Sequence, residues 1–331
     1  MKKLSFYLIA LLLIPAFIFT SCKDEEKVEP ASTTLANYLT ANHMDISDVL
    51  AYTPATGDPI KFVTGAPATD ADVAGWAANF YIIDIRSTAD FAAGHITGAH
   101  NVAAFSGILT EAANAGDKRI LMVCYTGQTA CYATALLRLA GHPDAQALKW
   151  GMSGWNSTLD KWTTKVGDIA VGNSNWTTAA APATVKYDTP ALTEAGDGAT
   201  ILAARVATVF ANGFKTVNGS DVLDSPSNYF INNYFSVDDY TAFGHFDGAY
   251  RINPLTIADD YIKNIDPTRK VVTYCYTGQT SAIITAYLNV LGYDAYSLLF
   301  GMNGLNHSSA AWSSNQWGGD SNPKNLSTVT K

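Results

Sequence analysis

The six-residue stretch CYTGQT occurs twice, at Cys124–Thr129 and at Cys275–Thr280, and each copy opens on a cysteine. A cysteine that ends a strand just before a helix lies near the unpaired N–H groups and the partial positive charge of the helix N-terminus. Both features stabilise a thiolate, so a lowered thiol pKa is expected. Gly127 and Gly278 let the backbone curl so that N–H groups point inward. The pattern therefore predicts an activated cysteine in a cradle of main-chain donors, with the closing threonine of each stretch as helix N-cap.

The loops do not fit phosphate chemistry. Cysteine phosphatases place an arginine six positions after the cysteine to hold the phosphate, whereas that position is Ala130 in one copy and Ser281 in the other. Neither loop contains a lysine or an arginine, and each is one residue shorter. Transfer of a single sulfur atom suits such a loop better. No Cys/His spacing resembles a zinc site and no glycine pattern resembles a nucleotide loop, so no metal and no cofactor are expected.

The repeat extends beyond the hexapeptide. Three further landmarks recur in the same order and 150 or 151 residues apart: GHITGAHNV from Gly94 and GHFDGAYRI from Gly244, Gly141 and Gly292, and GMSGW and GMNGL. A solenoid repeat would have a period of tens of residues. The sequence therefore indicates two copies of a whole domain.

Within each copy, apolar β-branched runs alternate with helical patterns. Phe80–Ile85, Ile120–Cys124 and Lys270–Cys275 are expected to be buried strands. A helical pattern follows each hexapeptide and ends near Gly141 or Gly292, where a helix C-terminus favours glycine. This alternation predicts an α/β fold of two domains, each a parallel sheet flanked by helices on both faces. Both hexapeptides then lie at the carboxyl ends of strands, where such sheets bind ligands.

The N-terminus is typical of a targeting segment. Lys2 and Lys3 precede an apolar run, Leu4–Phe19, which is short for a membrane span. Thr20-Ser21-Cys22 resembles the lipobox of bacterial lipoproteins, which implies diacylation of Cys22 and membrane attachment through the lipid alone. An ordinary secretory signal is the alternative. The acidic stretch after Cys22 resembles the surface-export signal of some Bacteroidetes lipoproteins, which implies an outer-membrane lipoprotein facing the periplasm or the cell surface. A simple polar spacer is the alternative for this stretch.

Composition and patterning together define a domain plan. The 331 residues carry a formal net charge of −8, which argues against a nucleic-acid partner. The expected organisation is a lipoprotein signal peptide (1–21), a polar tether (22–34), a first domain (35–166), a linker (167–190), a second domain (191–320) and a tail (321–331).

The combined motifs resemble a tandem rhodanese, a sulfurtransferase family. IDIR, DFAAGHITGAHNV, CYTGQT and GMSGW occur in this order in the first copy, and the resemblance covers most of 70–160 and 220–310. It implies that Cys124 and Cys275 take a sulfane sulfur from a donor as a persulfide and pass it to a thiol or another thiophilic acceptor. It also implies that the transferred sulfur is bound by the backbone of the residues that follow: Tyr125, Thr126, Gly127, Gln128 and Thr129, and Tyr276, Thr277, Gly278, Gln279 and Thr280.

Other residues are expected to have structural roles. Asp84 and Arg86 lie two apart on one face of a strand and are predicted to order nearby loops as an ion pair. The second copy has Asn233-Tyr234-Phe235 in their place. Buried or hydrogen-bonded structural positions are expected for His95, His245, Cys131, Met152, Met302 and Trp155, and a resolving thiol is a second reading of Cys131.

Three functional hypotheses remain open on this evidence. The first is an envelope-anchored sulfurtransferase. The second is a sulfur carrier or protein-binding module without multiple turnover, and the third is a disulfide between Cys124 and Cys275. Because the loops are uncharged and the protein is anionic, we expect a persulfide, polysulfide or protein-bound sulfur as donor and thiosulfate as a poor one.

Overall fold

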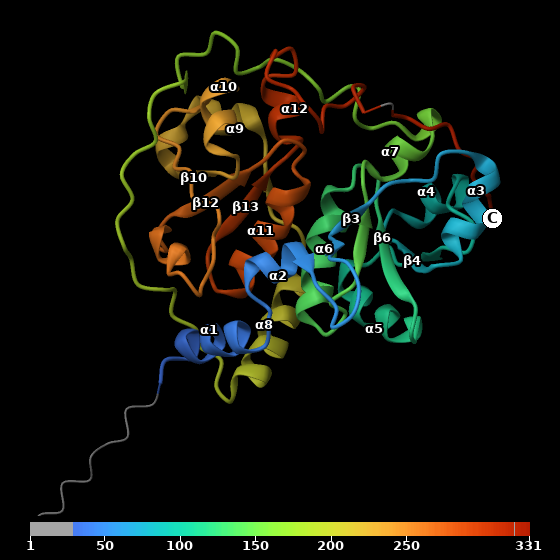
Figure 1. The fold of residues 1–331 in the computed structure, drawn as a ribbon, viewed down its shortest axis with the longest axis horizontal. Coiled ribbons are helices and arrows are strands. Elements are labelled where there is room, and N and C mark those ends of the chain that lie inside the picture. The colour runs from blue at the N-terminus through green and yellow to red at the C-terminus, as the bar shows by residue number, and fades with distance from the viewer. Residues whose placement is uncertain (1–28, 321) are drawn as a thin grey trace, which may run out of the picture.

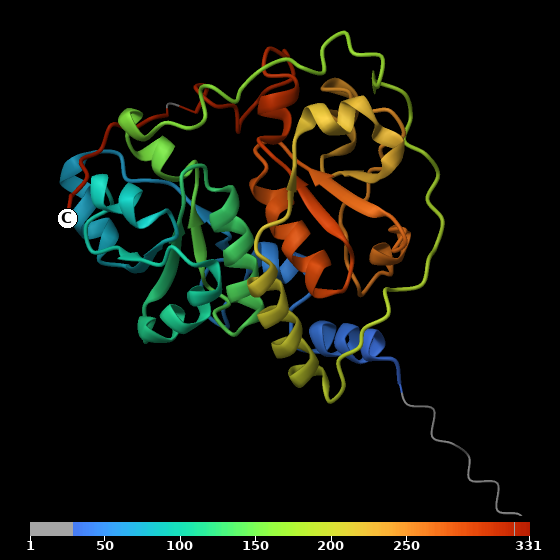
Figure 2. The same ribbon diagram turned by 180° about the vertical axis from the view of Figure 1, so that it is seen from behind.

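The chain folds into two similar α/β units, as expected from the repeat (Figures 1 and 2). The computed structural model describes residues 29–320 and 322–331. The expected signal peptide, most of the tether and Cys22 lie outside these residues. None of the described helices combines the length and apolar character that crossing a bilayer requires.

Each unit is built on a parallel sheet. The first sheet has the order β3 (Val63–Thr64), β7 (Gln146–Leu148), β6 (Arg119–Val123), β4 (Phe80–Asp84) and β5 (His100–Asn101). The second has the order β10 (Tyr229–Asn233), β12 (Lys270–Tyr274), β13 (Ala295–Leu298) and β9 (Thr216–Val217). The expected α/β class with parallel sheets is confirmed, and the predicted strands end one residue earlier than expected.

Helices cover both faces of each sheet (Figure 1). In the first half of the chain they are α1 (Ala31–Ala41), α2 (Ile46–Leu50), α3 (Asp70–Ala77), α4 (Thr88–Ala93), α5 (Ile108–Ala112), α6 (Gln128–Leu139) and α7 (Gly151–Trp155). In the second half they are α8 (Gly198–Asn212), α9 (Gly219–Asp224), α10 (Val237–Ala242), α11 (Gln279–Val290) and α12 (Gly301–Leu305). Short 3₁₀ turns span Phe105–Gly107, Ala113–Ala115, Ser157–Leu159, Pro226–Asn228 and Tyr261–Asn264, and the remaining strands are β1 (Ala51–Tyr52), β2 (Ile60–Lys61), β8 (Trp176–Thr177) and β11 (His245–Phe246).

Helices α6 and α11, which follow the two cysteine loops, pack against each other at the centre of the molecule (Figures 1 and 2). Both are buried on nearly every side, which explains why their sequences are apolar or small almost all round. One apolar cluster joins them and contains Leu136 and Leu137 from one unit with Ile283 and Ile284 from the other. The two units therefore share a core.

A buried carboxylate fastens the N-terminal segment to the second unit. Asp45 caps α2 through a 2.7 Å bond from Ile46 N. The same carboxylate accepts hydrogen bonds from Ile257 N and Ala258 N, both at 3.0 Å, and from the Tyr287 hydroxyl at 3.1 Å. Since Asp45 is 5% exposed, this contact links the units away from water.

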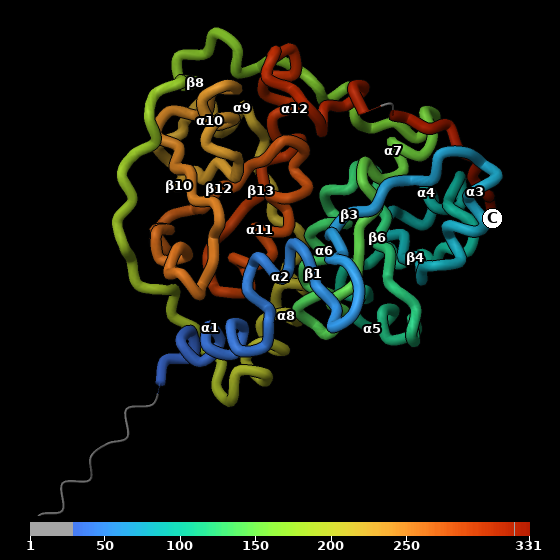
Figure 3. Tube along the Cα trace, viewed as in Figure 1, coloured from blue at the N-terminus to red at the C-terminus, as the bar shows by residue number. Residues whose placement is uncertain are grey.

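The segments that follow α7 and α12 each cross to the other unit, as the tube in Figure 3 shows. After α7 the chain runs over the second unit, where Gly167 N donates to Asn303 O and β8 pairs with β11. After α12 it returns to the first unit, where Lys324 N donates to Gly154 O and Val329 bridges to His95. The crossing segments hold the two units together.

Candidate active site

Both cysteines lie where a central strand meets a central helix. Cys124 follows β6 and precedes α6, and Cys275 follows β12 and precedes α11. Their side chains are 6% and 2% exposed. The half-buried members of the two loops are Tyr125, Thr126 and Thr129 in the first, and Tyr276 and Thr280 in the second. These side chains are the members of the two loops that solvent partly reaches.

Main-chain N–H groups point at the first sulfur. Gly127 N donates to Cys124 Sγ at 3.1 Å and Ala130 N donates to it at 3.4 Å. The sequence places the donors within residues 125–129, so Ala130 is one residue beyond that range. The loop curls around the sulfur because Gly127 adopts a left-handed conformation with φ of 83°.

The second loop has the same form with fewer donors. Ser281 N donates to Cys275 Sγ at 3.3 Å, and the thiol lies 3.7 Å from Ser281 Oγ. Gly278 has φ of 75°. Each helix begins at the glutamine of the hexapeptide with this glycine as its N-cap, so the expectation of a threonine N-cap is wrong.

Burial has a larger effect on the first thiol than the helix N-terminus has. Burial raises the pKa of Cys124 above its usual value, and the hydrogen bonds from Ala130, Thr126 and Gly127 lower it only in part. The negative charge of Asp84 adds to the rise. The expected lowering of the pKa is therefore wrong for Cys124, because the depth of the loop outweighs the amide cradle.

The recurring GMSGW motif holds the first cysteine loop through main-chain hydrogen bonds. Met152 N donates to Cys124 O and Ser153 N donates to Tyr125 O, both at 2.9 Å. A Cβ on Gly151 would lie 2.4 Å from Cys124 O, so only glycine permits this approach. In the second copy, Met302 N donates to Cys275 O and Asn303 N donates to Tyr276 O. Gly301 takes the place of Gly151, and a Cβ on it would lie 2.2 Å from Cys275 O.

Asp84 and Arg86 form the buried ion pair that the sequence predicts. The guanidinium donates to the carboxylate through Nε at 3.0 Å and Nη2 at 2.7 Å. Nη2 also donates to Gly94 O at 2.7 Å, and the guanidinium carbon lies 5.1 Å from the centre of the Tyr125 ring. The pair ties the cysteine loop to the turn at Gly94.

In the second copy, neutral residues replace the pair. The register of β10 on β12 puts Asn233 opposite Tyr274, as Asp84 lies opposite Val123. Asn233 Nδ2 donates to the Tyr274 hydroxyl at 2.8 Å. Phe235 takes the place of the arginine and stacks on Tyr276, with ring centres 4.3 Å apart.

The tyrosine after each cysteine is held by a carboxylate that the sequence did not indicate. Burial and the carboxylate of Asp90 raise the pKa of Tyr125. The Tyr276 hydroxyl donates to Asp239, and burial together with this carboxylate raises its pKa strongly. Lys161 adds a cation 5.4 Å from the centre of the Tyr125 ring. The first loop therefore has cationic neighbours although it contains none.

The two loops also touch each other. Gln279 Nε2 donates to Thr126 O at 3.1 Å, and Trp162 Nε1 donates to the same oxygen at 3.2 Å. Gln128 Oε1 accepts a 2.8 Å bond from Phe300 N in the second unit. Both glutamines were expected to contribute backbone to sulfur binding, whereas their side chains cross between the units.

The remaining expectations concern structural residues. Cys131, Met152, Met302 and Trp155 are fully buried, as predicted. His95 Nδ1 lies 2.8 Å from Phe91 O and His245 Nδ1 lies 3.1 Å from Tyr240 O, in agreement with structural roles. Cys124, Cys131 and Cys275 are all free, so the disulfide hypothesis is wrong.

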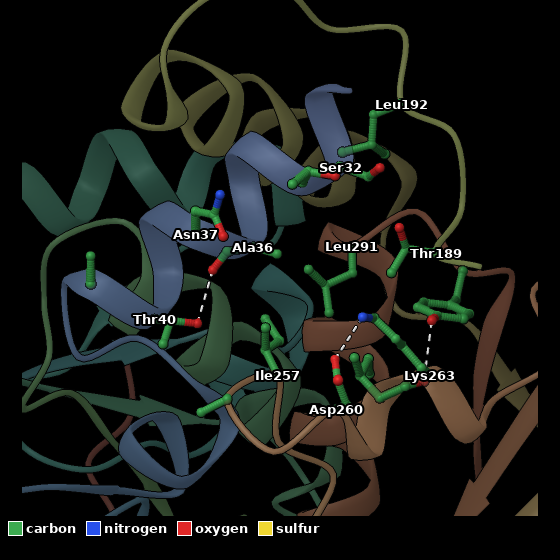
Figure 4. A pocket seen from close by; sticks show the side chains of 15 residues that line it. Ser32, Ala36, Asn37, Thr40, Thr189, Leu192, Ile257, Asp260, Lys263 and Leu291 are labelled. Atoms are coloured by element: carbon green, nitrogen blue, oxygen red, sulfur yellow. Dashed lines mark hydrogen bonds and ion pairs between the residues drawn. The ribbon is translucent and has the colours of Figure 1, made fainter. Parts of the chain in front are cut away.

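Potential metal ligands and a cavity away from the cysteine loops bear on the binding of other ligands. Within it, no group of three His, Cys, Asp or Glu side chains is placed to hold a metal ion. A cavity of about 460 Å³ lies beside α1 (Figure 4), with Asn37, Thr40 and the Asp260–Lys263 ion pair among its lining residues. Neither cysteine loop contributes to this cavity.

Comparison with known proteins identifies the family. The model of the rhodanese-like domain matches twice, over residues 69–158 and 230–308, which together make up more than half of the chain. A thiosulfate sulfurtransferase GlpE of Pseudomonas putida (strain GB-1) is 39% identical over 82 residues, 23% of this chain and 70% of the relative. The GlpE of Pseudomonas fluorescens (strain SBW25) is 34% identical over 98 residues, 28% and 80% of the two chains. The protein belongs to the rhodanese-like sulfurtransferase family and contains two rhodanese domains in tandem.

Solved structures of sulfurtransferases share a smaller fraction of identical residues with this chain. The thiosulfate sulfurtransferase from Pseudomonas aeruginosa is 16% identical, with 86% of this chain and 48% of that chain covered and a TM-score of 0.28. The 3-mercaptopyruvate sulfurtransferase from Leishmania major is 15% identical, with 81% and 76% covered and a TM-score of 0.28.

Proposed function

We propose that the protein moves sulfane sulfur from a donor to a thiophilic acceptor through persulfides at Cys124 and Cys275. The observation that carries this proposal is the position of Cys124 Sγ, which accepts N–H bonds from Gly127 and Ala130 where a strand gives way to a buried helix. Such donors stabilise an anionic sulfur and remain in place when a second sulfur is added.

The reaction has two displacement steps. In the first, the cysteine thiolate attacks the outer sulfur of the donor, a new S–S bond forms, and the leaving group departs with the electron pair of the broken bond. In the second, an acceptor thiolate attacks the terminal sulfur of the persulfide, and the cysteine leaves as a thiolate. Because burial raises the pKa of Cys124, the first step is expected to accelerate as pH rises.

We further propose a persulfide, polysulfide or protein-bound sulfur as the physiological donor and a low rate with thiosulfate. The net charge of the protein is −8, so long-range attraction of a dianion is absent. The two cations near Tyr125, Arg86 and Lys161, lie close to the carboxylates of Asp84 and Asp90, which offset them.

The test is intact mass spectrometry after treatment with a polysulfide. We expect a gain of about 32 Da per loaded cysteine, lost on addition of an acceptor thiol. Cys124→Ser and Cys275→Ser should each remove one increment, and Cys131→Ser, the matched control, should remove none. Loading without repeated turnover would favour the carrier function, and the absence of any increment on Cys124 and Cys275 would refute the proposal.

We also propose anchoring through lipidated Cys22 in the outer membrane, from the N-terminal sequence pattern. Cells that express the full chain with a labelled fatty acid should incorporate label into the protein, and Cys22→Ala should abolish incorporation. Label that persists in that variant would contradict the lipoprotein assignment.

A further inference from the structure

A carboxylate lies beside the tyrosine that follows the cysteine in both units. Tyr125 lies near the carboxylate of Asp90, and the Tyr276 hydroxyl donates to Asp239. Each aspartate lies in the first turn of a short helix that a serine caps. Both tyrosines are half-buried, whereas the cysteines are almost fully buried. The tyrosine is therefore the more exposed neighbour of the buried cysteine in each unit.

The groups around these two tyrosines differ in chemistry. In the first unit, Arg86 and Lys161 lie 5.1 and 5.4 Å from the centre of the Tyr125 ring. In the second unit the ring of Tyr276 is surrounded by aromatic side chains, with centre distances of 4.3 Å to Phe235, 6.0 Å to Phe243 and 6.3 Å to Trp312. The first surrounding is polar and charged, and the second is apolar.

The local charge also differs. The cations of Arg86 and Lys161 offset the carboxylates of Asp84 and Asp90 in the first unit. In the second unit, the Asp239 carboxylate accepts from the hydroxyls of Ser236 and Tyr276, and no ion pair involves it among the residues that the structure describes. The sequence places Ala311, before a tryptophan, where the first copy has Lys161. The second site therefore carries about one more negative charge than the first.

From these differences we infer that the two cysteines take sulfur from donors of different chemical class, an inference that rests on the proposed function. Cys124 takes sulfur from small anionic donors faster than Cys275 does. Cys275 takes sulfur from donors with an apolar or aromatic body and little charge, which contact the half-buried Tyr276 and Trp312, and the buried Phe235 and Phe243 keep the surroundings of these rings apolar. Arg86 and Phe235, buried at equivalent positions against Tyr125 and Tyr276, set this specificity through those tyrosines.

Two probes with the same reacting group separate these classes. Thiosulfate is a dianion and yields a cysteine persulfide and sulfite. An aromatic thiosulfonate is a monoanion and yields the same persulfide and an aromatic sulfinate. In both reactions the thiolate attacks the outer sulfur, the S–S bond of the donor breaks, and the leaving group keeps the electron pair. The rate difference therefore reports on charge and on the aromatic body.

The measurement uses full-length Cys275→Ser, in which Cys124 reacts, and Cys124→Ser, in which Cys275 reacts. We expect the ratio of the thiosulfate rate to the thiosulfonate rate to be roughly tenfold higher at Cys124, because the donors differ by one unit of charge, which has about this effect at about 10 Å from one further charge at an effective dielectric constant of about 20. Added salt should raise the thiosulfate rate at Cys275 because it screens the repulsion. Equal ratios at both cysteines would overturn the inference, whereas absence of loading by any donor would overturn the proposed function instead.

Exchange of the specificity residues gives a second measurement. Asn233→Asp combined with Phe235→Arg, in the Cys124→Ser background, should move the donor ratio of Cys275 toward that of Cys124. Where this variant does not fold, the salt dependence at the two unmodified sites decides the question. A folded exchange variant with an unchanged ratio would contradict the assignment of specificity to these positions.

Discussion

Replacement of Gly127 by alanine tests whether the second unit braces the first cysteine loop. Gly127 has φ of +83°, and a Cβ there would lie 2.4 Å from Gln279 Nε2. The left-handed conformation costs an L-residue roughly 1–2 kcal/mol. Displacement of Gln279 also breaks its bond to Thr126 O and leaves a buried amide without a partner, which costs about 1–3 kcal/mol. We expect Gly127→Ala to lower the free energy of unfolding by about 2–5 kcal/mol in all.

A double-mutant cycle separates these two costs. Gln279→Ala alone should cost about 1 kcal/mol, because Thr126 O keeps its bond from Trp162. In that background the amide is already absent, so Gly127→Ala should cost the backbone contribution of roughly 1–2 kcal/mol and the remaining close contact of its Cβ with Leu148 O at 3.0 Å. The expected coupling between the two positions is therefore about 1–3 kcal/mol. Urea denaturation measures the free energies, and the rate of sulfur loading at Cys124 reports on the loop.

Gly98 provides a matched control, because its φ is +78° and a Cβ there would meet no atom within 4 Å. Gly98→Ala thus measures the backbone cost alone. If Gly127→Ala cost no more than Gly98→Ala, or if the effects of Gly127→Ala and Gln279→Ala were additive, the bracing of the loop by the second unit would be refuted.

Three further predictions concern the two units and their thiols. Asp45→Ala should lower the free energy of unfolding by about 2–4 kcal/mol, because two backbone N–H groups and a tyrosine hydroxyl of the second unit lose their acceptor. Urea denaturation measures this free energy, and a loss below about 1 kcal/mol would contradict the prediction. The rate of alkylation of Cys124 should rise about tenfold per pH unit from about pH 6 to about pH 8, because its pKa is raised and the thiol is therefore largely protonated in this range. Cys131, whose pKa is raised well above the usual value, should stay unlabelled in the folded protein. Peptide mass analysis measures the labelling, and a flat pH profile or equal labelling of the two cysteines would contradict this. Gly198→Ala should lower the free energy of unfolding by about 1–3 kcal/mol, because a Cβ there would lie 2.2 Å from Tyr38 Cβ, between α1 and α8. The midpoint of thermal unfolding should fall in this variant and recover when Tyr38→Ala is added. An unchanged midpoint in the single variant would contradict the prediction, because it would show that the two helices move apart without cost.

The sequence predicted those features that depend on local spacing. The strand before each cysteine, the glycine at the end of each following helix and the Asp84–Arg86 pair lie where the pattern put them. Each depends on residues that are neighbours along one strand or one helix turn. Gly151 could also be predicted as a landmark, although the reason for it, contact with Cys124 O, is visible only in three dimensions.

The features that the sequence did not reveal depend on depth and on contact between the units. The bond from Gln279 to Thr126 joins residues 153 apart, and no periodicity reports such a pairing. Lys161 approaches Tyr125 only because the segment after α7 folds back over the loop. The direction of the Cys124 pKa shift depends on the balance between burial and the amide cradle, and burial of a loop cannot be read from its composition.

The contacts between the two cysteine loops at the centre of the molecule limit which residues can change as the two sites diverge. Because Gln279 braces the first loop and Gln128 holds Phe300 of the second unit, loss of either unit would disturb both cradles. Gly278 and Gln279 of the second hexapeptide therefore have a structural role whether or not Cys275 reacts. Residues outside the hexapeptide are not bound by this constraint. Divergence in function is then expected first at positions such as Arg86 and Phe235, which face the tyrosine and take no part in the contacts between the two loops.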